Sequence, residues 1–137
     1  MKEKFQNLYY GKKTGAELDE IYEKVDLAVA SLGLYKIKIE VGSFIKTGEY
    51  LAKGLPMITG SKVDVLDHNE FDYFLEYTND STPIAIERMI EFRDRIYADG
   101  RKKVKSDIRE YAFKKVDISV SMQAVTDVMR RHMNEKR

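Results

Sequence analysis

Two charged residues on one predicted helix, Lys46 and Glu49, offer the clearest chemistry in this sequence. They lie in the stretch 43–59, which predicts a short helix that leads into a buried strand. Their spacing puts both side chains on one face of that helix. Free N–H groups and the dipole at a helix start favour negative charge, so this turn together with Lys46 suits a phosphate. A solvated helix surface also carries lysine and glutamate, and the residues alone leave both interpretations open.

The same stretch marks where the helix begins and ends. Ser43 can act as the N-cap, because its hydroxyl can accept hydrogen bonds from the unpaired N–H groups of the first turn. Gly54 stands where a left-handed residue closes a helix, and Pro56 prevents its continuation. The apolar residues that follow predict the entry to a strand.

Several other kinds of site are disfavoured. His68 and His132 have no partner at metal-ligand spacing and the chain has no cysteine, so we expect no metal centre. Neither a Gly-x-Gly-x-x-Gly loop nor a Walker A motif occurs, and Ser31 lacks the glycine frame of a nucleophile elbow. The basic run 101–105 predicts a solvated approach to a helix. With a net charge of only +1 and no stacking aromatic pattern, we expect no nucleic-acid partner.

The length and composition of the sequence predict one domain, residues 1–137. Hydrophobic residues at 43% and charged residues at 34% are typical of a soluble globular protein with a hydrophobic core. No apolar run approaches the roughly 18 residues that span a bilayer, and the first residues lack the apolar centre of a signal peptide. Together with the lack of cysteine, this favours a cytoplasmic location.

Hydrophobic periodicity predicts alternating strands and helices. A helix begins at Thr14, whose spacing to Glu17 is that of a capping box, and a stripe of four apolar residues follows (Leu18, Ile21, Tyr22 and Val25). The segment 35–41 alternates polar and apolar residues. It is either a half-exposed strand or an extended loop, and we favour the loop because strand, helix and strand surround it. The predicted strands are 5–10, 27–30, 55–59 and 71–77, and the remaining helices are 83–99, 106–115 and 119–132.

This order predicts an α/β fold: a mostly parallel sheet of about four strands flanked by helices, with further helices at the C-terminal end. Parallel sheets bind ligands outside the carboxyl ends of their strands. The segments 10–14, 31–42 and the residues after Thr59 would gather at that edge. The helix start at Ser43 points to the same place.

The stretch Lys46-Thr-Gly-Glu-Tyr-Leu-Ala-Lys-Gly-Leu-Pro-Met-Ile resembles the signature of the family 4 glycosyltransferases, which have the two-domain GT-B architecture. The donor-binding half of those enzymes carries a Lys-x-x-Glu-Tyr-Leu-Ala-x-Gly-x-Pro-Val-Ile type of segment. The helix and strand over 18–31, and the helices from Pro83 onward, are similar to that family's flanking elements in the same order. The resemblance implies a Rossmann-like domain, part of the C-terminal domain of a GT-B enzyme.

The resemblance also implies a role for each candidate residue. The donor substrate would be a nucleoside diphosphate sugar, and the carboxylate of Glu49 would accept hydrogen bonds from its ribose hydroxyls. The helix end and Lys46 would balance the negative charge of the diphosphate, so neither a cofactor nor a metal is implied. The expected diphosphate contacts are Ser43, Phe44, Ile45 and Lys46, and the expected neighbours of the base are Tyr10, Gly11 and Lys12.

Two departures from the family pattern matter. Val41 stands where the family often has a second glutamate that contacts the donor sugar, and Glu40 is one residue away. The first strand–helix–strand unit of the donor domain, and the acceptor-binding half, have no counterpart in the chain. We therefore expect a fragment or a degenerate stand-alone domain of a transferase for polysaccharide biosynthesis. It would be inactive without an N-terminal partner domain, and the full-length enzyme would be cytoplasmic or peripheral to a membrane.

The alternative is a non-catalytic α/β module that binds a protein partner. It predicts no nucleotide binding and an apolar surface where the missing strands would lie. Both interpretations allow a homo-oligomer through an exposed sheet edge.

Overall fold

The computed structural model describes residues 7–135 as an α/β fold of five α-helices, one 3-10 helix and five short strands. Three strands form a parallel sheet in the order β1–β3–β5, and two more pair in parallel as a separate ribbon. The sheet consists of β1 (Ala28–Val29), β3 (Met57–Thr59) and β5 (Phe74–Glu76). The ribbon consists of β2 (Val41–Gly42) and β4 (Lys62–Val63). The central strand β3 is buried along its whole length, as a strand with neighbours on both sides should be.

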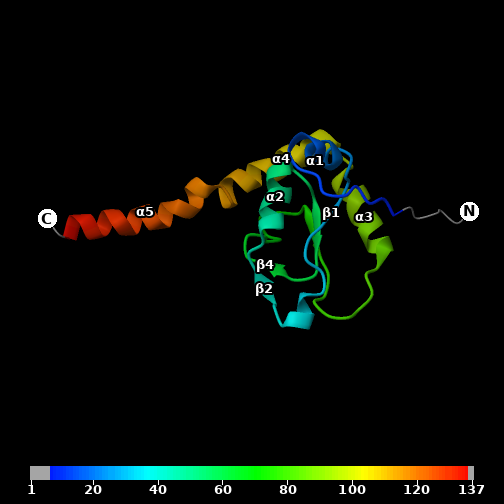
Figure 1. Ribbon diagram of the computed structural model, residues 1–137, viewed down its shortest axis with the longest axis horizontal. Coiled ribbons are helices and arrows are strands. Elements are labelled where there is room, and N and C mark those ends of the chain that lie inside the picture. The colour runs from blue at the N-terminus through cyan, green and yellow to red at the C-terminus, as the bar shows by residue number, and fades with distance from the viewer. Residues whose placement is uncertain (1–6, 136–137) are drawn as a thin grey trace, which may run out of the picture.

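The core forms where the sheet meets two helices, α2 (Ile45–Lys53) and α4 (Arg101–Lys115). Leu51 of α2, Met57 of β3 and Ile108 of α4 belong to one cluster and are each 0% exposed. Full burial of a side chain of this size contributes about 1.5–3 kcal/mol relative to leaving it in water. Figure 1 shows α2 running from the β2–β4 ribbon at one end to α1 and α4 at the other.

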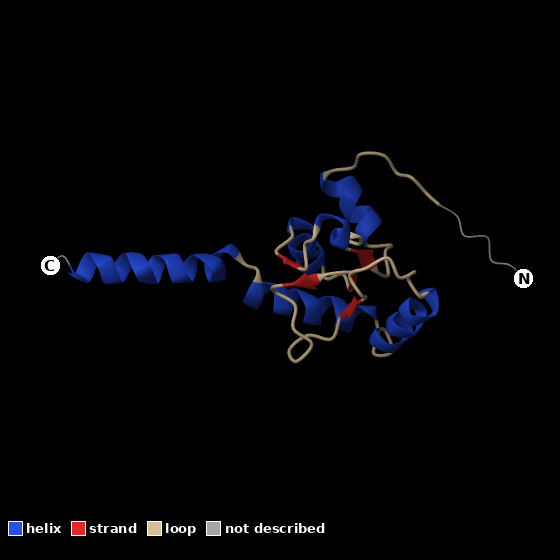
Figure 2. Ribbon diagram, turned by 90° about the horizontal axis from the view of Figure 1, so that it is seen from below, coloured by secondary structure: helices blue, strands red, loops and turns tan. Residues whose placement is uncertain are grey.

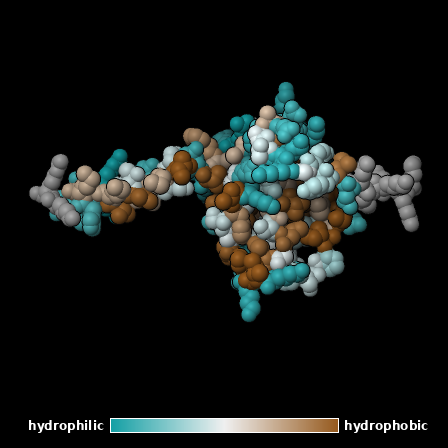
Figure 3. Space-filling model, in the orientation of Figure 1, coloured by the Kyte–Doolittle hydropathy of each residue, from teal (hydrophilic) through white to brown (hydrophobic). Residues whose placement is uncertain are grey.

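The three further helices are α1 (Gly15–Tyr22), α3 (Ile86–Ile96) and α5 (Ile118–Glu135). The α1 helix is tied to α2 by an ion pair between Asp19 and Lys53 at 2.5 Å. The α5 helix extends away from the rest of the molecule as a single rod (Figures 1 and 2). Its apolar side chains are exposed and give the rod brown patches in Figure 3; they are Ile118, Val120, Met122, Val125, Val128, Met129 and Met133.

The general α/β class with parallel strands is confirmed, and the arrangement of the strands differs from the prediction. The strands make two sheets in place of one sheet of about four strands. The prediction of a first strand over 5–10 is wrong for residues 7–10, which form no strand, while residues 5 and 6 lie outside the described part of the chain. Exposed Tyr9 and Tyr10 explain the difference: aromatic residues favour a strand only where a neighbouring strand can cover them.

The helix boundaries differ in informative ways. Phe44, and not Ser43, occupies the N-cap position of α2, and no side chain caps that end. Thr14 is the N-cap of α1 as predicted, but its side chain makes no capping bond. Helix α3 begins at Ile86, three residues after Pro83.

The basic run 101–105 forms the first turn of α4, so the prediction that it only precedes a helix is wrong. Val104 in this run is buried in the core, and the cations around it have acidic partners on the surface. Arg101 pairs with Asp26 and Lys105 with Glu23, while Lys103 pairs with Asp107 one turn along the same helix.

The segment 35–41, which we favoured as an extended loop, is not a strand over its length, but only residues 38–40 lie outside regular elements. It contains the short 3-10 helix η1 (Leu34–Ile37), and it ends in the two-residue strand β2. Of the helices within 7–135, none combines the length and the apolar character that a membrane crossing requires.

Gly54 confirms the prediction for the end of α2, because it adopts the left-handed conformation with φ +73°. A Cβ at this position would lie 2.8 Å from the backbone oxygen of Lys105 on α4. The glycine therefore does two things: it closes α2, and it lets α4 approach.

We predict opposite effects for two glycine-to-alanine substitutions in this region. Gly54→Ala should destabilise the protein by about 2–4 kcal/mol, because left-handed strain and the clash with α4 add. Gly48→Ala should stabilise it by about 0.5–1 kcal/mol, because Gly48 is inside α2 and a Cβ there would meet nothing within 4 Å. Urea unfolding followed by circular dichroism measures both, and equal effects would contradict this account of α2.

Candidate functional site

The first turn of α2 lies at the carboxyl edge of the parallel sheet. The chain leaves β1 at that edge, passes through η1 and β2, and returns along α2 to the start of β3, which is parallel to β1. A helix that connects parallel strands must run opposite to them, so its N-terminus points to the edge where ligands bind in such sheets.

Asn79 fixes the connection between β1 and α2. Its side-chain oxygen accepts from the backbone N–H of Tyr35 at 3.0 Å, and its side-chain nitrogen donates to the backbone oxygen of Ile39 at 2.7 Å. The pairing of β2 with β4 holds the end of the same connection. The approach to α2 is therefore tied to the loops that follow β3 and β5, and the start of the helix has a defined position.

A pocket of about 330 Å³ opens at this helix start. Ser43, Phe44, Ile45 and Gly48 form one side of it, and residues from the loop after β4 and from α4 and α5 form the rest. Lys115, at the end of α4, is paired with Glu70 at 2.5 Å, and this partner raises the pKa of the lysine. The cation at the pocket is therefore already paired with a carboxylate, and the pocket offers uncapped helix N–H groups beside it. The remaining lining residues are Asp64, Val65, Val116 and Ser121.

Lys46 lies on the exposed surface of the same turn and has no ion-pair partner among residues 7–135. Thr47, one position further, points into the protein and is only 1% exposed. The hydroxyl of Thr47 and that of buried Ser61 have no hydrogen-bond partner within the described chain. Buried hydroxyls without partners are uncommon, because leaving one unpaired costs about 1–3 kcal/mol.

Glu49 lies on the second turn of α2, and its carboxylate is fixed by a tyrosine of α1. The hydroxyl of Tyr22 donates to Glu49 Oε1 at 3.0 Å. The pKa of Tyr22 is raised to about 12, first because burial disfavours the charged phenolate and then because of the hydrogen bond to Glu49. The ring of Tyr22 also packs edge-on against the ring of Tyr50, with centroids 6.2 Å apart.

The structure brings some of the predicted site residues together and separates others. Ser43, Phe44 and Ile45 line one pocket at the start of α2, while Lys46 and Glu49 occupy other faces of that helix. The expected base neighbours Tyr10, Gly11 and Lys12 are exposed, precede α1 and do not line that pocket. In Figure 1, α1 and the β2–β4 ribbon lie at opposite ends of α2.

Three residues of this region were not among the sequence candidates: Tyr22, Asn79 and Lys115. Tyr22 was assigned only to the apolar stripe of its helix. A signal was available, since a partly buried tyrosine needs a partner for its hydroxyl. Asn79 lies between the predicted strand 71–77 and the predicted helix 83–99, and no sequence pattern reveals that its amide reaches a segment about 40 positions earlier.

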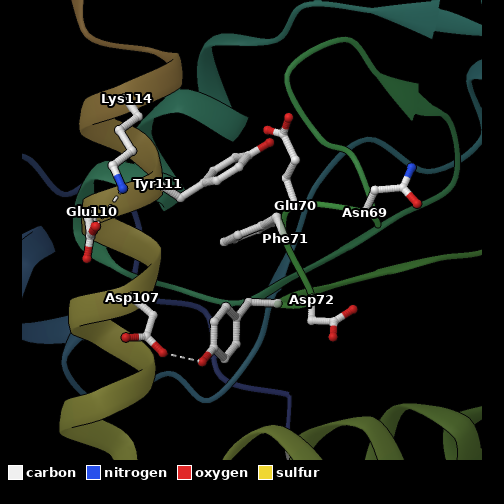
Figure 4. Close-up of a pocket in the computed structure, with 9 residues that line it drawn as sticks. Asn69, Glu70, Phe71, Asp72, Asp107, Glu110, Tyr111 and Lys114 are labelled. Carbon is white, nitrogen blue, oxygen red and sulfur yellow. Dashed lines mark hydrogen bonds and ion pairs between the residues drawn. The ribbon is translucent and has the colours of Figure 1, made fainter.

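A second pocket, of about 410 Å³, lies between the loop 69–73 and α4 (Figure 4). Three of its carboxylates have partners: Asp107 accepts from Tyr73 at 2.6 Å, Glu110 pairs with Lys114 at 2.6 Å and Glu70 pairs with Lys115 at 2.5 Å. Lys103 and then Tyr73 lower the pKa of Asp107. The acidic residues that α4 contributes to this pocket are therefore occupied in ordinary hydrogen bonds and ion pairs at the helix surface. In the described part of the chain, no group of three or more His, Cys, Asp or Glu residues is arranged to hold a metal ion.

Comparisons with known proteins found no match to this chain among family models, curated proteins or solved structures.

The raised pKa of Tyr22 predicts a loss of stability in alkali. The folded state holds the phenol proton up to about pH 12, while the unfolded chain releases it near pH 10, so unfolding releases a proton between these values. The contribution of Tyr22 to the free energy of unfolding has its full value below pH 10 and is lost as the pH rises to 12.

Urea unfolding at pH 8, 10, 11 and 12 measures this loss. Other tyrosines with raised pKa values (Tyr50, Tyr73, Tyr77, Tyr97 and Tyr111) contribute to the total fall. Tyr22→Phe should therefore reduce the fall without removing it. An unchanged fall in the variant would show that the Tyr22 phenol is not protected by folding.

Proposed function

We propose that this chain is the nucleotide-sugar-binding portion of a glycosyltransferase that transfers a sugar from a nucleoside diphosphate to an acceptor in polysaccharide biosynthesis. The fold would be part of the Rossmann-like C-terminal domain of a GT-B enzyme. The observation that carries the proposal is the course of α2 between parallel strands. Its uncapped first turn faces the carboxyl edge, and the residues of that turn are those that the sequence resemblance assigns to a diphosphate.

The first turn of α2 suits a diphosphate for three physical reasons. No side chain caps this end, and the N–H groups of Ile45 and Lys46 are available as donors, while that of Thr47 already donates to the backbone oxygen of Phe44. The helix dipole adds partial positive charge at the same point. Lys46 supplies a mobile cation on the surface of that turn, and Lys115 stands at the pocket.

Glu49 suits the ribose. An ionised carboxylate only accepts hydrogen bonds, and sugar hydroxyls are donors. Tyr22 occupies one acceptor position on Oε1, which leaves Oε2 for a ligand. The half-buried position of Glu49 keeps such a hydrogen bond partly shielded from water.

In the proposed reaction this domain acts by electrostatics. As the bond between the sugar and the diphosphate breaks, negative charge grows on the leaving diphosphate. Fixed donors at the start of α2 stabilise that charge, and they need not reorganise during the reaction. The residues that act on the acceptor would belong to an N-terminal partner domain.

Recognition of the donor sugar would differ from that of the family. Val41, at the position of the family's second glutamate, begins β2 and is more than half exposed. Neighbouring side chains of an extended segment point to opposite faces, so Glu40 does not take the place of Val41. The proposal therefore includes a sugar held without this second carboxylate.

The alternative is a module that binds a protein partner, and α5 is the observation that favours it. A continuous set of exposed apolar side chains on a helix that leaves the domain is a typical interaction surface. The sheet edges at β1 and β5 are a second such surface, through which copies of the chain could associate.

Isothermal titration calorimetry with UDP, GDP and dTDP tests the proposed function. We predict that the wild-type chain binds at least one of these nucleotides. Glu49→Ala should weaken that binding about 10- to 100-fold, since a hydrogen bond to a charged group contributes about 1.5–3 kcal/mol. Glu91→Ala removes an exposed carboxylate of α3 and should leave the affinity unchanged.

Two results would count against the proposal. Equal affinities for wild type and Glu49→Ala would remove Glu49 from the site. A wild-type chain that binds none of the three nucleotides would favour the protein-interaction module.

A further inference from the structure

The hydrogen bond between Tyr22 and Glu49 joins two helices through side chains that are 27 positions apart in the sequence. Tyr22 ends α1, and Glu49 lies in the middle of α2. Both side chains are partly buried. Glutamate has several freely rotating bonds, and a single well-placed donor restricts them to few conformations.

The tyrosine itself is held in place. Its ring packs edge-on against Tyr50 of α2, at an interplanar angle of 83°. One turn earlier on α1, Asp19 pairs with Lys53 of α2. Because α1 and α2 are only 8 and 9 residues long, these contacts fix the relative position of the two helices.

The direction of the hydrogen bond follows from the chemistry of its partners. Tyr22 keeps its proton far above neutral pH, so it is the donor, and the ionised carboxylate of Glu49 is the acceptor. The bond takes one of the lone pairs on Oε1. Both lone pairs of Oε2 and one of Oε1 remain for a ligand, in a fixed orientation.

We infer that Tyr22 is a positioning residue that makes the site prefer ribonucleotides over 2′-deoxyribonucleotides; this inference rests on the proposed function. A ribose offers two neighbouring hydroxyl donors, which match the two oxygens of one carboxylate, whereas a 2′-deoxyribose offers one. A carboxylate that turned freely could adapt to a single hydroxyl. One that is held by Tyr22 keeps an oxygen aimed at the missing hydroxyl, and the deoxy ligand leaves it unpaired.

The affinity ratio of UDP to 2′-deoxy-UDP, measured by calorimetry on the full chain, tests the inference. Wild type should prefer UDP about tenfold, the value of one partly exposed hydrogen bond to a charged group. Tyr22→Phe keeps the ring that packs on Tyr50, and should lower the ratio to between about one and two. Its affinity for 2′-deoxy-UDP should stay within about twofold of wild type, a pattern that general destabilisation does not produce.

Tyr97→Phe is the matched control. It removes a tyrosine hydroxyl that donates to the backbone oxygen of Asp26 at 2.8 Å, and this bond does not involve Glu49. The wild-type ratio should be retained in this variant.

The outcomes separate this inference from the proposed function. A wild-type chain that binds none of UDP, 2′-deoxy-UDP, GDP and dTDP overturns both. A wild-type preference for UDP that persists in Tyr22→Phe overturns the role of Tyr22 and leaves the proposed function standing.

If circular dichroism shows that Tyr22→Phe is unfolded, Glu49→Gln takes its place. Its amide oxygen can still accept from Tyr22, while an NH₂ group replaces the second acceptor oxygen. The preference for UDP should then disappear, and its retention would overturn the inference.

Discussion

Burial of one side of α2 is the constraint on which the rest of this structure depends. Leu51 is completely excluded from water together with Met57 on the central strand and Ile108 on α4. This packing joins the sheet to α4, and it sets the rotation of α2 about its own axis. Gly54 makes the arrangement possible, because only a residue without a side chain both closes α2 and allows α4 to approach.

The fixed rotation of α2 decides which residues can meet a ligand. Thr47 and Leu51, one turn apart, point into the core. Lys46 and Glu49 are then turned away from it, with Glu49 directed to α1 and its tyrosine. The first turn is meanwhile held at the sheet edge by Asn79 and by the pairing of β2 with β4. The proposed nucleotide site therefore needs no dedicated scaffold beyond the contacts that fold the domain.

Features that depend on local chemistry could be predicted from the sequence. Gly54 and Pro56 marked the end of α2 because left-handed backbone and a missing N–H are properties of single residues. Features that depend on distant partners could not be predicted. The aromatic residues before Gly11 have strand propensity but no strand beside them. The basic start of α4 packs Val104 into the core, while Arg101 and Lys105 pair with Asp26 and Glu23. The candidate site shows the same division: Glu49 was predicted from its motif, while its partner Tyr22 was visible only in the fold.

The most direct measurement of the central claim is a titration of the ¹⁵N-labelled chain with UDP, GDP and dTDP in turn, followed by amide chemical shifts in NMR. If the first turn of α2 holds the diphosphate and Glu49 holds the ribose, the largest shifts will be at Ile45, Lys46 and Thr47, with further shifts at Glu49 and Tyr22. Shifts confined to α5 or to the pocket beside loop 69–73, or no shifts at all, would contradict the account.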